Sequence, residues 1–313
     1  MIITGKYPKL RMRRSRKNDW MRRLVRENSL SSNDFILPIF ATEGKNKKIP
    51  IKTMPEVFRY SEDRLSQIVD KALKLKIPMV AIFPQTNSGL KDSYGSEALN
   101  ENNLVCKAIR KIKDRYKNEI GIMTDVALDP YTSHGHDGIL SDKKILNDET
   151  IEILIQQSLL QAQMGSDVIA PSDMMDGRIG EIRQELDNNS LKDIKILSYA
   201  VKYASSFYGP FRDAVGSKKS LKGDKKTYQM DFSNSEEALR EVALDIKEGA
   251  DLVMVKPGLP YLDIIKKVKE NFKIPVFAYQ VSGEYSLLMN GINKGLINDN
   301  SIYETLMSFK RAG

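Results

Sequence analysis

Seven short apolar runs, most of them separated by amphipathic stretches, constrain the fold of this 313-residue chain more than any other feature. The runs are FILPIF (35–40), MVAIFP (79–84), IGIMTDVAL (120–128), SDVIAPSD (166–173), IKILSYAVKY (194–203), DLVMVKP (251–257) and PVFAYQV (275–281). The clearest helical stretch is SEEALREVALDIKEG (235–249), which begins with a serine and two glutamates and ends on a glycine, as helices commonly do. Strands that alternate with helices pair in parallel through helical crossovers.

A barrel accounts for this pattern better than an open nucleotide-binding sheet. The length suits a single α/β barrel, and no Gly-x-Gly-x-x-Gly follows any of the runs. We therefore predict a TIM-type (β/α)8 barrel in residues 31–313, preceded by an extended N-terminal arm in residues 1–30. Only seven strands can be counted, so the eighth strand is expected to be missing at the C-terminus.

Charge narrows the class of protein. The net charge is +8, which by itself is compatible with nucleic-acid binding. The basic residues gather in segments 11–26 and 218–226, and neither has the alternating aromatic residues of a base-stacking surface, so we expect no nucleic-acid partner. We interpret the first segment as an arm that clasps a neighbouring subunit. The second is interpreted as a loop that suits anionic substrates.

Hydrophobicity and cysteine content indicate a cytoplasmic protein. No apolar run reaches the roughly 18–20 residues that span a bilayer, so no membrane partner is expected. The N-terminus lacks the apolar core of a secretion signal. The single cysteine, Cys106, leaves no partner for a disulfide within the chain and excludes a cysteine metal cluster.

Chemistry in such barrels is located at the C-terminal ends of the strands. The residues found there are Asp125, Ser172, Asp173, Lys202, Lys256, Tyr279 and Ser282. Regular strand alternation predicts two sets of side chains that each share one face. The sets are Ile196, Ser198, Ala200 and Lys202 in the fifth run, and Leu252, Met254 and Lys256 in the sixth. If these runs are neighbours, the two lysines lie side by side.

A lysine at the end of an apolar run has two interpretations. Lys256 can extend its ammonium to the surface from the strand end, or it can be desolvated and act as a nucleophile. A second ammonium at Lys202 favours the nucleophile, because burial and a like charge both lower a lysine pKa. A neutral amine attacks a ketone to form a Schiff base. One such lysine suggests a class I aldolase, whereas two suggest that two carbonyl substrates are bound and joined.

Five longer motifs resemble one family. They are MVKPGLPYLDI, KYASSFYGPFRDA, APSDMMDGR, DPYTSHGHDG and VSGEY. They are similar to motifs of porphobilinogen synthase, also called 5-aminolaevulinate dehydratase, and the similarity runs from residue 11 to residue 313 in the order expected of that family. That family condenses two molecules of 5-aminolaevulinate into porphobilinogen in tetrapyrrole and haem biosynthesis. The resemblance implies that Lys256 holds the substrate that becomes the propionate side and Lys202 the one that becomes the acetate side.

The resemblance also implies supporting roles. Asp125 transfers protons, Tyr279 packs on the substrate of Lys256, and Ser282 binds its carboxylate. The other residues implied to bind substrate are Ser172 and Asp173 in the opposite wall, Tyr208 and Phe211 as a cover, and Arg212, Lys225 and Gln229 at the second carboxylate. A lid is expected at residues 208–230. Lys225 stands where the family usually has arginine, which puts a two-pronged contact in doubt.

Metal requirements are also implied by the family. Zinc-dependent members carry three cysteines where this chain has Ala127, Asp129 and Asp137, so we expect no catalytic zinc. The two histidines of the chain lie in this segment and are expected to be structural. Glu241 matches a glutamate that binds an allosteric Mg²⁺ through waters. The expected assembly is a homo-oligomer, an octamer or a hexamer built from dimers.

Alternatives remain at this point. A single-lysine aldolase needs only one of the two lysines, and a catalytically impaired barrel could act as a basic scaffold or binding protein. Family members continue past residue 313 into an eighth strand and a tyrosine that shares a substrate carboxylate. We therefore expect a barrel open between its first and seventh strands, with the gap covered by the arm, a loop or a neighbouring subunit, and a raised KM.

Overall fold

Seven parallel strands form the wall of a barrel in the computed structural model, which describes residues 5–215, 221 and 223–313. They are β1 (Ile36–Thr42), β4 (Met79–Gln85), β5 (Gly121–Val126), β8 (Val168–Pro171), β9 (Lys195–Lys202), β10 (Leu252–Lys256) and β11 (Val276–Ala278). They lie side by side in chain order, and every pair is parallel. Each predicted apolar run supplies one strand, so the predicted barrel topology is confirmed.

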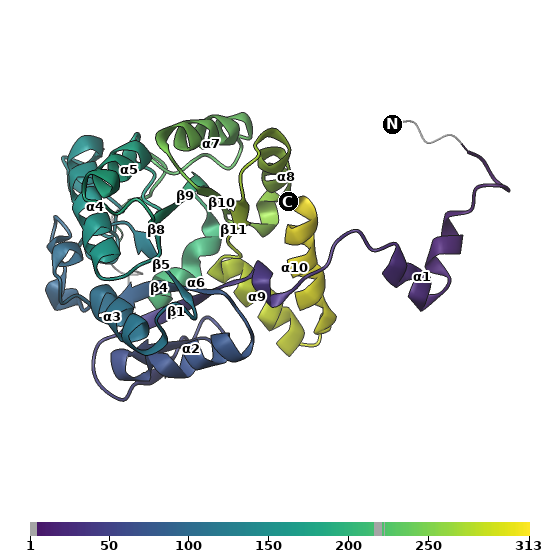
Figure 1. Cartoon of the computed structure of the whole chain (residues 1–313), viewed down its shortest axis with the longest axis horizontal. Helices are drawn as coiled ribbons and strands as arrows, with labels where there is room; N and C mark the ends of the chain where they lie inside the picture. The colour runs from purple at the N-terminus through teal and green to yellow at the C-terminus, as the bar shows by residue number, and fades with distance from the viewer. Residues whose placement is uncertain (1–4, 216–220, 222) are drawn as a thin grey trace.

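Helices surround this wall (Figure 1). They are α2 (Leu65–Lys74), α3 (Leu104–Tyr116), α4 (Asn147–Gln163), α5 (Arg178–Asn188), α7 (Glu236–Glu248), α8 (Leu262–Asn271), α9 (Ser282–Asn293) and α10 (Asn300–Ala312). The short α6 (Gly209–Ala214) follows β9 at its C-terminal end. Helix α7 begins after Ser235 and ends at Gly249, whose φ of +109° suits the left-handed residue after a helix.

Side chains divide between the barrel interior and the helix layer. One buried cluster joins strand residues such as Met123, Leu197, Tyr199 and Met254, and it contains no residue of α2–α5, α7 or α8. The clusters that include those helices take the alternate strand residues, for example Val253. Interior residues therefore alternate with helix-facing residues along each strand, as the barrel requires.

Strand β9 breaks this alternation. Val253 of β10 is paired with Ser198, but Val255 is paired with Val201, so β9 holds one extra residue over that span. Ile196 and Ala200 pack with the helix layer, and the hydroxyl of Ser198 donates to Asp245 on α7. The predicted shared face of the fifth run is therefore wrong. A β-bulge turns the end of the strand, and it brings Lys202 to the interior.

The edges of the sheet meet other parts of the chain rather than each other. The free edge of β1 is paired with β3 (Phe58–Ser61), which in turn pairs with β2 (Lys48–Pro50). Within the described residues β11 is hydrogen-bonded to β10 alone, so the expected opening between the first and seventh strands is present. Helix α9 is joined to the β2–β3 loop, since Tyr285 Oη donates to the carbonyl of Pro55 (2.5 Å) and Ser286 Oγ to that of Thr53 (2.6 Å).

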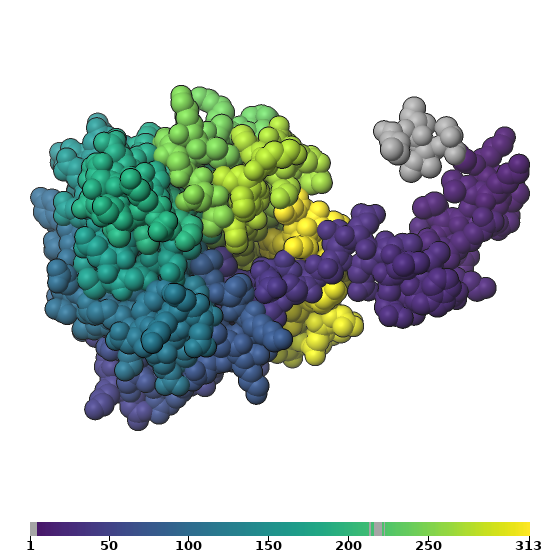
Figure 2. Space-filling view, viewed as in Figure 1, coloured from purple at the N-terminus to yellow at the C-terminus, as the bar shows by residue number. Residues whose placement is uncertain are grey.

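The N-terminal arm lies apart from the barrel. It contains η1 (Met12–Arg16) and α1 (Asp19–Leu24), and Figures 1 and 2 show it extending away from the rest of the chain. The arm therefore does not cover the opening of its own barrel. Helix α10 is tied to the segment before β1 by an ion pair of 2.5 Å between Lys310 and Asp34. None of the helices in the described residues is long and apolar enough to cross a membrane.

Candidate active site

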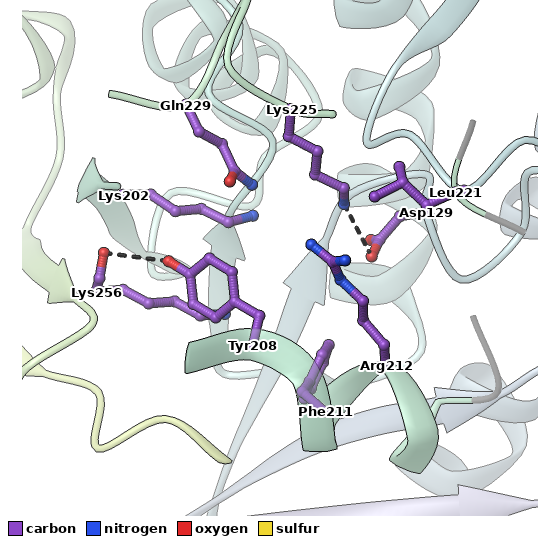
Figure 3. Close-up of a pocket in the computed structure, with 10 residues that line it drawn as sticks. Asp129, Lys202, Tyr208, Phe211, Arg212, Leu221, Lys225, Gln229 and Lys256 are labelled. Atoms are coloured by element: carbon purple, nitrogen blue, oxygen red, sulfur yellow. Dashed lines mark hydrogen bonds and ion pairs between the residues drawn. The ribbon is translucent and has the colours of Figure 1, made fainter. Parts of the chain in front are cut away.

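Two lysines from neighbouring strands enter one pocket. Lys202 and Lys256 end β9 and β10, and they are direct partners in the register of those parallel strands. Their relative exposures are 5% and 6%. Figure 3 shows both side chains directed into the same hollow, as predicted from the strand ends. The interpretation of Lys256 as a surface lysine is therefore wrong.

Aromatic rings surround the ammonium of Lys256. Its Nζ lies 4.8 Å from the ring centre of Tyr279, 5.0 Å from Tyr199, 5.3 Å from Phe211 and 5.6 Å from Tyr208. Burial and the neighbouring Lys202 together lower the pKa of Lys256 to about 7, although nearby carboxylates oppose the shift. At neutral pH a large fraction of this amine is therefore unprotonated and able to attack a carbonyl carbon.

Lys202 has acidic rather than aromatic surroundings. Its Nζ donates to the carbonyl of Ser172 and lies 3.6 Å from Asp137 Oδ1. The ammonium of Lys225 lies 3.0 Å from Asp137 and 3.4 Å from Asp129. Burial opposes ionisation of Asp137, but Lys202 and Lys225 outweigh it and hold its pKa well below the usual range. These groups form an ion-paired cluster in which Asp137 stays charged.

Asp125 lies near both lysines. It lies on β5 two residues after Met123, which faces the barrel interior. Its Oδ1 is buried with no hydrogen-bond partner among the described residues. Burial raises its pKa to about 6, although Lys256 and Lys202 both oppose this shift. A carboxyl group that titrates near neutrality beside an amine is suited to proton transfer.

Asp173 supports the wall of the pocket from behind. Its Oδ1 accepts a hydrogen bond from the backbone N–H of Met175 (2.7 Å), and its Oδ2 lies 3.5 Å from Arg178 Nε. Arg178 is only 2% exposed and lies 3.4 Å from Asp245 on α7. Burial raises the pKa of Asp173 to about 6, against the effect of Arg178. Its carboxylate therefore faces this ion network and not the space where Lys202 and Lys256 point.

The lid supplies the rest of the lining. Tyr208, Phe211, Arg212, Lys225 and Gln229 all border the pocket, as expected, together with Leu221. Tyr208 Oη donates to the carbonyl of Tyr203 (2.8 Å), which seats the ring over Lys256. Residues 216–220 and 222 of the expected lid, and with them part of the basic segment 218–226, lie outside the described residues.

Ser282 is the first residue of α9. Its Oγ accepts a hydrogen bond from the backbone N–H of Phe211 (2.7 Å) and donates to the carbonyl of Phe207 (3.5 Å). The hydroxyl therefore links the lid to the barrel in this structure.

The segment expected to replace the zinc site is held by hydrogen bonds. His134 Nε2 lies 3.1 Å from the carbonyl of Ser93, and His136 Nδ1 lies 3.1 Å from Tyr228 Oη. The carboxylates of Asp129 and Asp137 are engaged by Lys225. Across the described ranges no three or more His, Cys, Asp or Glu side chains are grouped so that they could hold an ion directly.

Glu241 lies away from this pocket. It is on α7 and borders an open surface hollow, together with Asp176 and Glu237. Burial raises its pKa, Asp245 adds to the shift, and Arg178 opposes it.

Sequence reasoning missed three charged residues around the site. Arg178 and Asp245 occupy core-facing helix positions, where a charge on an apolar stripe could have indicated a buried pair. Lys91 has an ammonium that is buried without a hydrogen-bond partner among the described residues. Burial lowers its pKa and Asp129 opposes the shift. No feature of the local pattern around Lys91 distinguishes it from a surface lysine.

Known proteins are similar to this chain in sequence and in architecture. A delta-aminolevulinic acid dehydratase from Bradyrhizobium diazoefficiens is 56% identical over 305 residues, covering 97% of this chain and 86% of that protein. One from Methanothermus sociabilis is 50% identical over 311 residues, covering 98% and 95%. The crystal structure of the enzyme from Toxoplasma gondii ME49, also named porphobilinogen synthase and bound to the reaction product porphobilinogen, has a TM-score of 0.94 and 45% identity, covering 97% of this chain and 87% of that one.

A family model gives the same result over nearly the whole length. The model described as delta-aminolevulinic acid dehydratase matches residues 9–313. This range includes every motif on which the resemblance was based, and the resemblance is confirmed. The chain belongs to the delta-aminolevulinic acid dehydratase family.

Proposed function

We propose that this chain condenses two molecules of 5-aminolaevulinate into porphobilinogen through Schiff bases on Lys202 and Lys256. The observation that carries the proposal is the direct pairing of these two buried lysines at the C-terminal ends of β9 and β10. A single-lysine aldolase needs only one reactive amine, so the second buried lysine in the same pocket speaks against it. A basic scaffold has no use for an amine whose pKa is about 7.

The proposed chemistry begins at Lys256. Its neutral amine attacks the ketone carbon of one substrate, and loss of water leaves a Schiff base. A second substrate forms a Schiff base with Lys202, again with loss of water, after this ammonium gives its proton to Asp125, so that the two carbon skeletons lie next to each other. Asp125, with a pKa of about 6, takes up and returns the protons that the joining steps require. The surrounding rings exclude water from the Schiff base on Lys256.

The carboxylates of the substrates are assigned to two different places. Ser282 binds the carboxylate of the substrate on Lys256. Arg212, Lys225 and Gln229, all in the lid, bind the other. Lys225 is already paired with Asp129 and Asp137, so its charge serves both the protein and the substrate. Lysine keeps the positive charge at this position but lacks the planar fork of arginine, so its contact with the substrate carboxylate is made through one nitrogen.

Trapping with borohydride tests the proposed function. Treatment with 5-aminolaevulinate and borohydride should leave adducts on both lysines in mass spectra of the peptides. Lys256→Ala and Lys202→Ala should each lower turnover by a factor on the order of 10³, and each should still trap substrate on the remaining lysine. Lys294→Ala, at an exposed position, is the matched control. Near-normal product formation by either active-site variant would contradict two Schiff bases.

The pH dependence of adduct formation tests the interaction between the lysines. Because the pKa of Lys256 is about 7, its trapping rate should rise with pH and level off above that value. Lys202 lowers this pKa, so Lys202→Met should move the midpoint to higher pH. Lys202→Arg keeps the positive charge and should leave the midpoint close to that of the unmodified protein. The same midpoint in all three proteins would show that the two charges do not interact.

We further propose that catalysis is independent of zinc. Thiolates favour zinc, whereas the corresponding positions here hold Ala127, Asp129 and Asp137. The ammonium of Lys225 lies between the two carboxylates, at 3.0 and 3.4 Å, and neutralises them as a cation would. This pairing supports the proposal that no metal is required at that place.

A chelator tests zinc independence. Activity should survive incubation with 1,10-phenanthroline, because the chain offers no thiolate ligand there. The control is a zinc-dependent member of the family treated in parallel, which should lose activity. Strong inhibition of this protein that only added zinc reverses would sink the proposal.

Magnesium is assigned to the surface position instead. The carboxylate of Glu241 fits a hydrated Mg²⁺, which usually keeps several waters and binds through one or two carboxylates. Such an ion would stabilise the assembly and take no part in the reaction. We propose a homo-oligomer built from dimers, in which the projecting arm clasps a neighbouring barrel, and a location in the cytoplasm, where a single buried cysteine is stable.

Sedimentation and activity together test the magnesium site. Added Mg²⁺ should raise activity or shift the sedimentation profile toward a larger oligomer. Glu241→Ala should abolish this response and retain basal turnover, because Glu241 lies outside the pocket of the two lysines. Glu119→Ala removes an exposed glutamate elsewhere and should respond as the unmodified protein does. An unchanged response in Glu241→Ala would assign the magnesium effect to another site.

A further inference from the structure

One buried acid beside the pocket has no role in the chemistry described so far. Glu284 is the third residue of α9, in the VSGEY motif, and it is 3% exposed. Burial raises its pKa to about 7, although the hydrogen bonds that it accepts from backbone N–H groups oppose this shift. A carboxyl group in such a place normally needs a specific set of partners.

The two oxygens of Glu284 bind two different segments. Oε2 accepts a hydrogen bond from the backbone N–H of Val281, the residue before α9. This first contact is the ordinary capping of a helix start. Oε1 accepts a hydrogen bond of 2.5 Å from the N–H of Leu259, in the loop that follows Lys256. Capping does not account for the second contact, which joins the end of β10 to the start of α9.

This link lies where the sheet no longer holds the two segments together. Strands β10 and β11 are paired over three residue pairs, the last of which joins Val255 to Ala278. One more backbone bond follows, from Tyr279 N–H to Val255 O (3.0 Å). After this bond the chain continues to Lys256 at the end of β10 and to Ser282 at the start of α9. The side chain of Glu284 connects the loop that follows Lys256 to the turn that precedes Ser282.

Close packing shows that the position of α9 is tightly constrained. A Cβ placed on Gly283 would lie 2.4 Å from the carbonyl oxygen of Phe207, at the base of the lid. A Cβ on Gly258 would lie 3.1 Å from the carbonyl oxygen of Tyr279. Backbone thus meets backbone on both sides of Glu284, and a small movement of either segment would change the distance between Lys256 and Ser282.

We propose that Glu284 is a positioning residue that fixes the distance between the amine of Lys256 and the hydroxyl of Ser282. It thereby selects the number of carbons between the ketone and the carboxylate of the first substrate. This inference rests on the proposed function, in which one substrate spans Lys256 and Ser282. The ligand class is a 4-oxo carboxylic acid, whose ketone and carboxylate are separated by two methylene groups.

Glu284→Gln is the informative substitution. The amide has almost the shape of the carboxylate, but it offers one acceptor oxygen where two N–H groups require acceptors. One of the two links must therefore be lost. The position of Lys256 relative to Ser282 should loosen, while Lys202, which is held by Ser172 and Asp137, should be unaffected.

A comparison of two keto acids provides the test. The full-length protein is incubated with 4-oxopentanoate or, separately, with 5-oxohexanoate, which is one methylene longer. Each sample is then reduced with borohydride. Adducts on Lys256 and Lys202 are quantified separately by mass spectrometry. The unmodified protein should prefer the shorter acid at Lys256, and Glu284→Gln should lower this preference by about tenfold. The adduct on Lys202 is the internal reference and should not change.

A matched control separates positioning from general loss of structure. Asp63 also accepts a backbone N–H, that of Asn46 at 2.9 Å, but it lies outside the pocket. Asp63→Asn should leave both adducts and the preference unchanged. Glu284→Asp keeps two acceptors on a shorter side chain and should restore part of the preference. Circular dichroism confirms that each variant is folded before trapping.

The possible outcomes distinguish this inference from the proposed function. If the unmodified protein forms no adduct with 5-aminolaevulinate on either lysine, the proposed function fails. If it forms both adducts but Glu284→Gln keeps the full preference at Lys256, the positioning role is overturned. An equal loss of both adducts in a folded Glu284→Gln protein also overturns it, because the effect would then be general.

Discussion

Two ammonium groups can share a buried pocket only if each is compensated in a different way. Direct pairing of Lys202 with Lys256 in parallel strands brings like charges together in a place where water cannot separate them. The structure resolves this by giving Lys202 an ion pair with Asp137 and leaving Lys256 among aromatic rings. Lys202 is therefore placed against a carboxylate, and Lys256 where its neutral form is favoured. Such a division of environments is how acid–base roles are assigned to similar groups.

The same constraint explains the buried charges behind the pocket. Arg178 joins Asp173, at the end of β8, to Asp245 on α7, and all three are almost fully buried. Buried ion pairs contribute little net stability, but loss of one partner is costly. Their effect here is to fix the segment after β8. The backbone carbonyl of Ser172 in this segment accepts a hydrogen bond from Lys202. The wall that orients one reactive lysine is thus attached to α7, the helix that carries Glu241.

The parts of the fold that follow regular periodicity could be predicted from the sequence. Seven apolar runs became the seven strands, and Lys202 and Lys256 at their ends became neighbours. The prediction that Lys202 shares a face with Ile196, Ser198 and Ala200 was wrong, because a β-bulge adds one residue without any change in the pattern of hydrophobicity.

The buried charges could not be predicted in the same way. Arg178 and Asp245 stabilise each other from different helices. A charge on the apolar stripe of a helix can indicate burial, but it does not indicate which distant residue is its partner. The same holds for Glu284, since a glutamate at the third position of a helix is usually read as a cap alone. Residues that act through contacts between distant segments need the structure, whereas residues at strand ends do not.

Ser282 shows how substrate binding and the lid can be linked without a large rearrangement. A carboxylate needs a hydrogen-bond donor, and the hydroxyl of Ser282 has one proton to donate. In this structure that proton is directed to the carbonyl of Phe207 over 3.5 Å, a long and weak contact. The shorter bond, 2.7 Å from the N–H of Phe211, uses the hydroxyl as an acceptor. A carboxylate can therefore take the proton while the bond to the lid remains, so the binding of the first substrate is compatible with a lid already seated over Lys256.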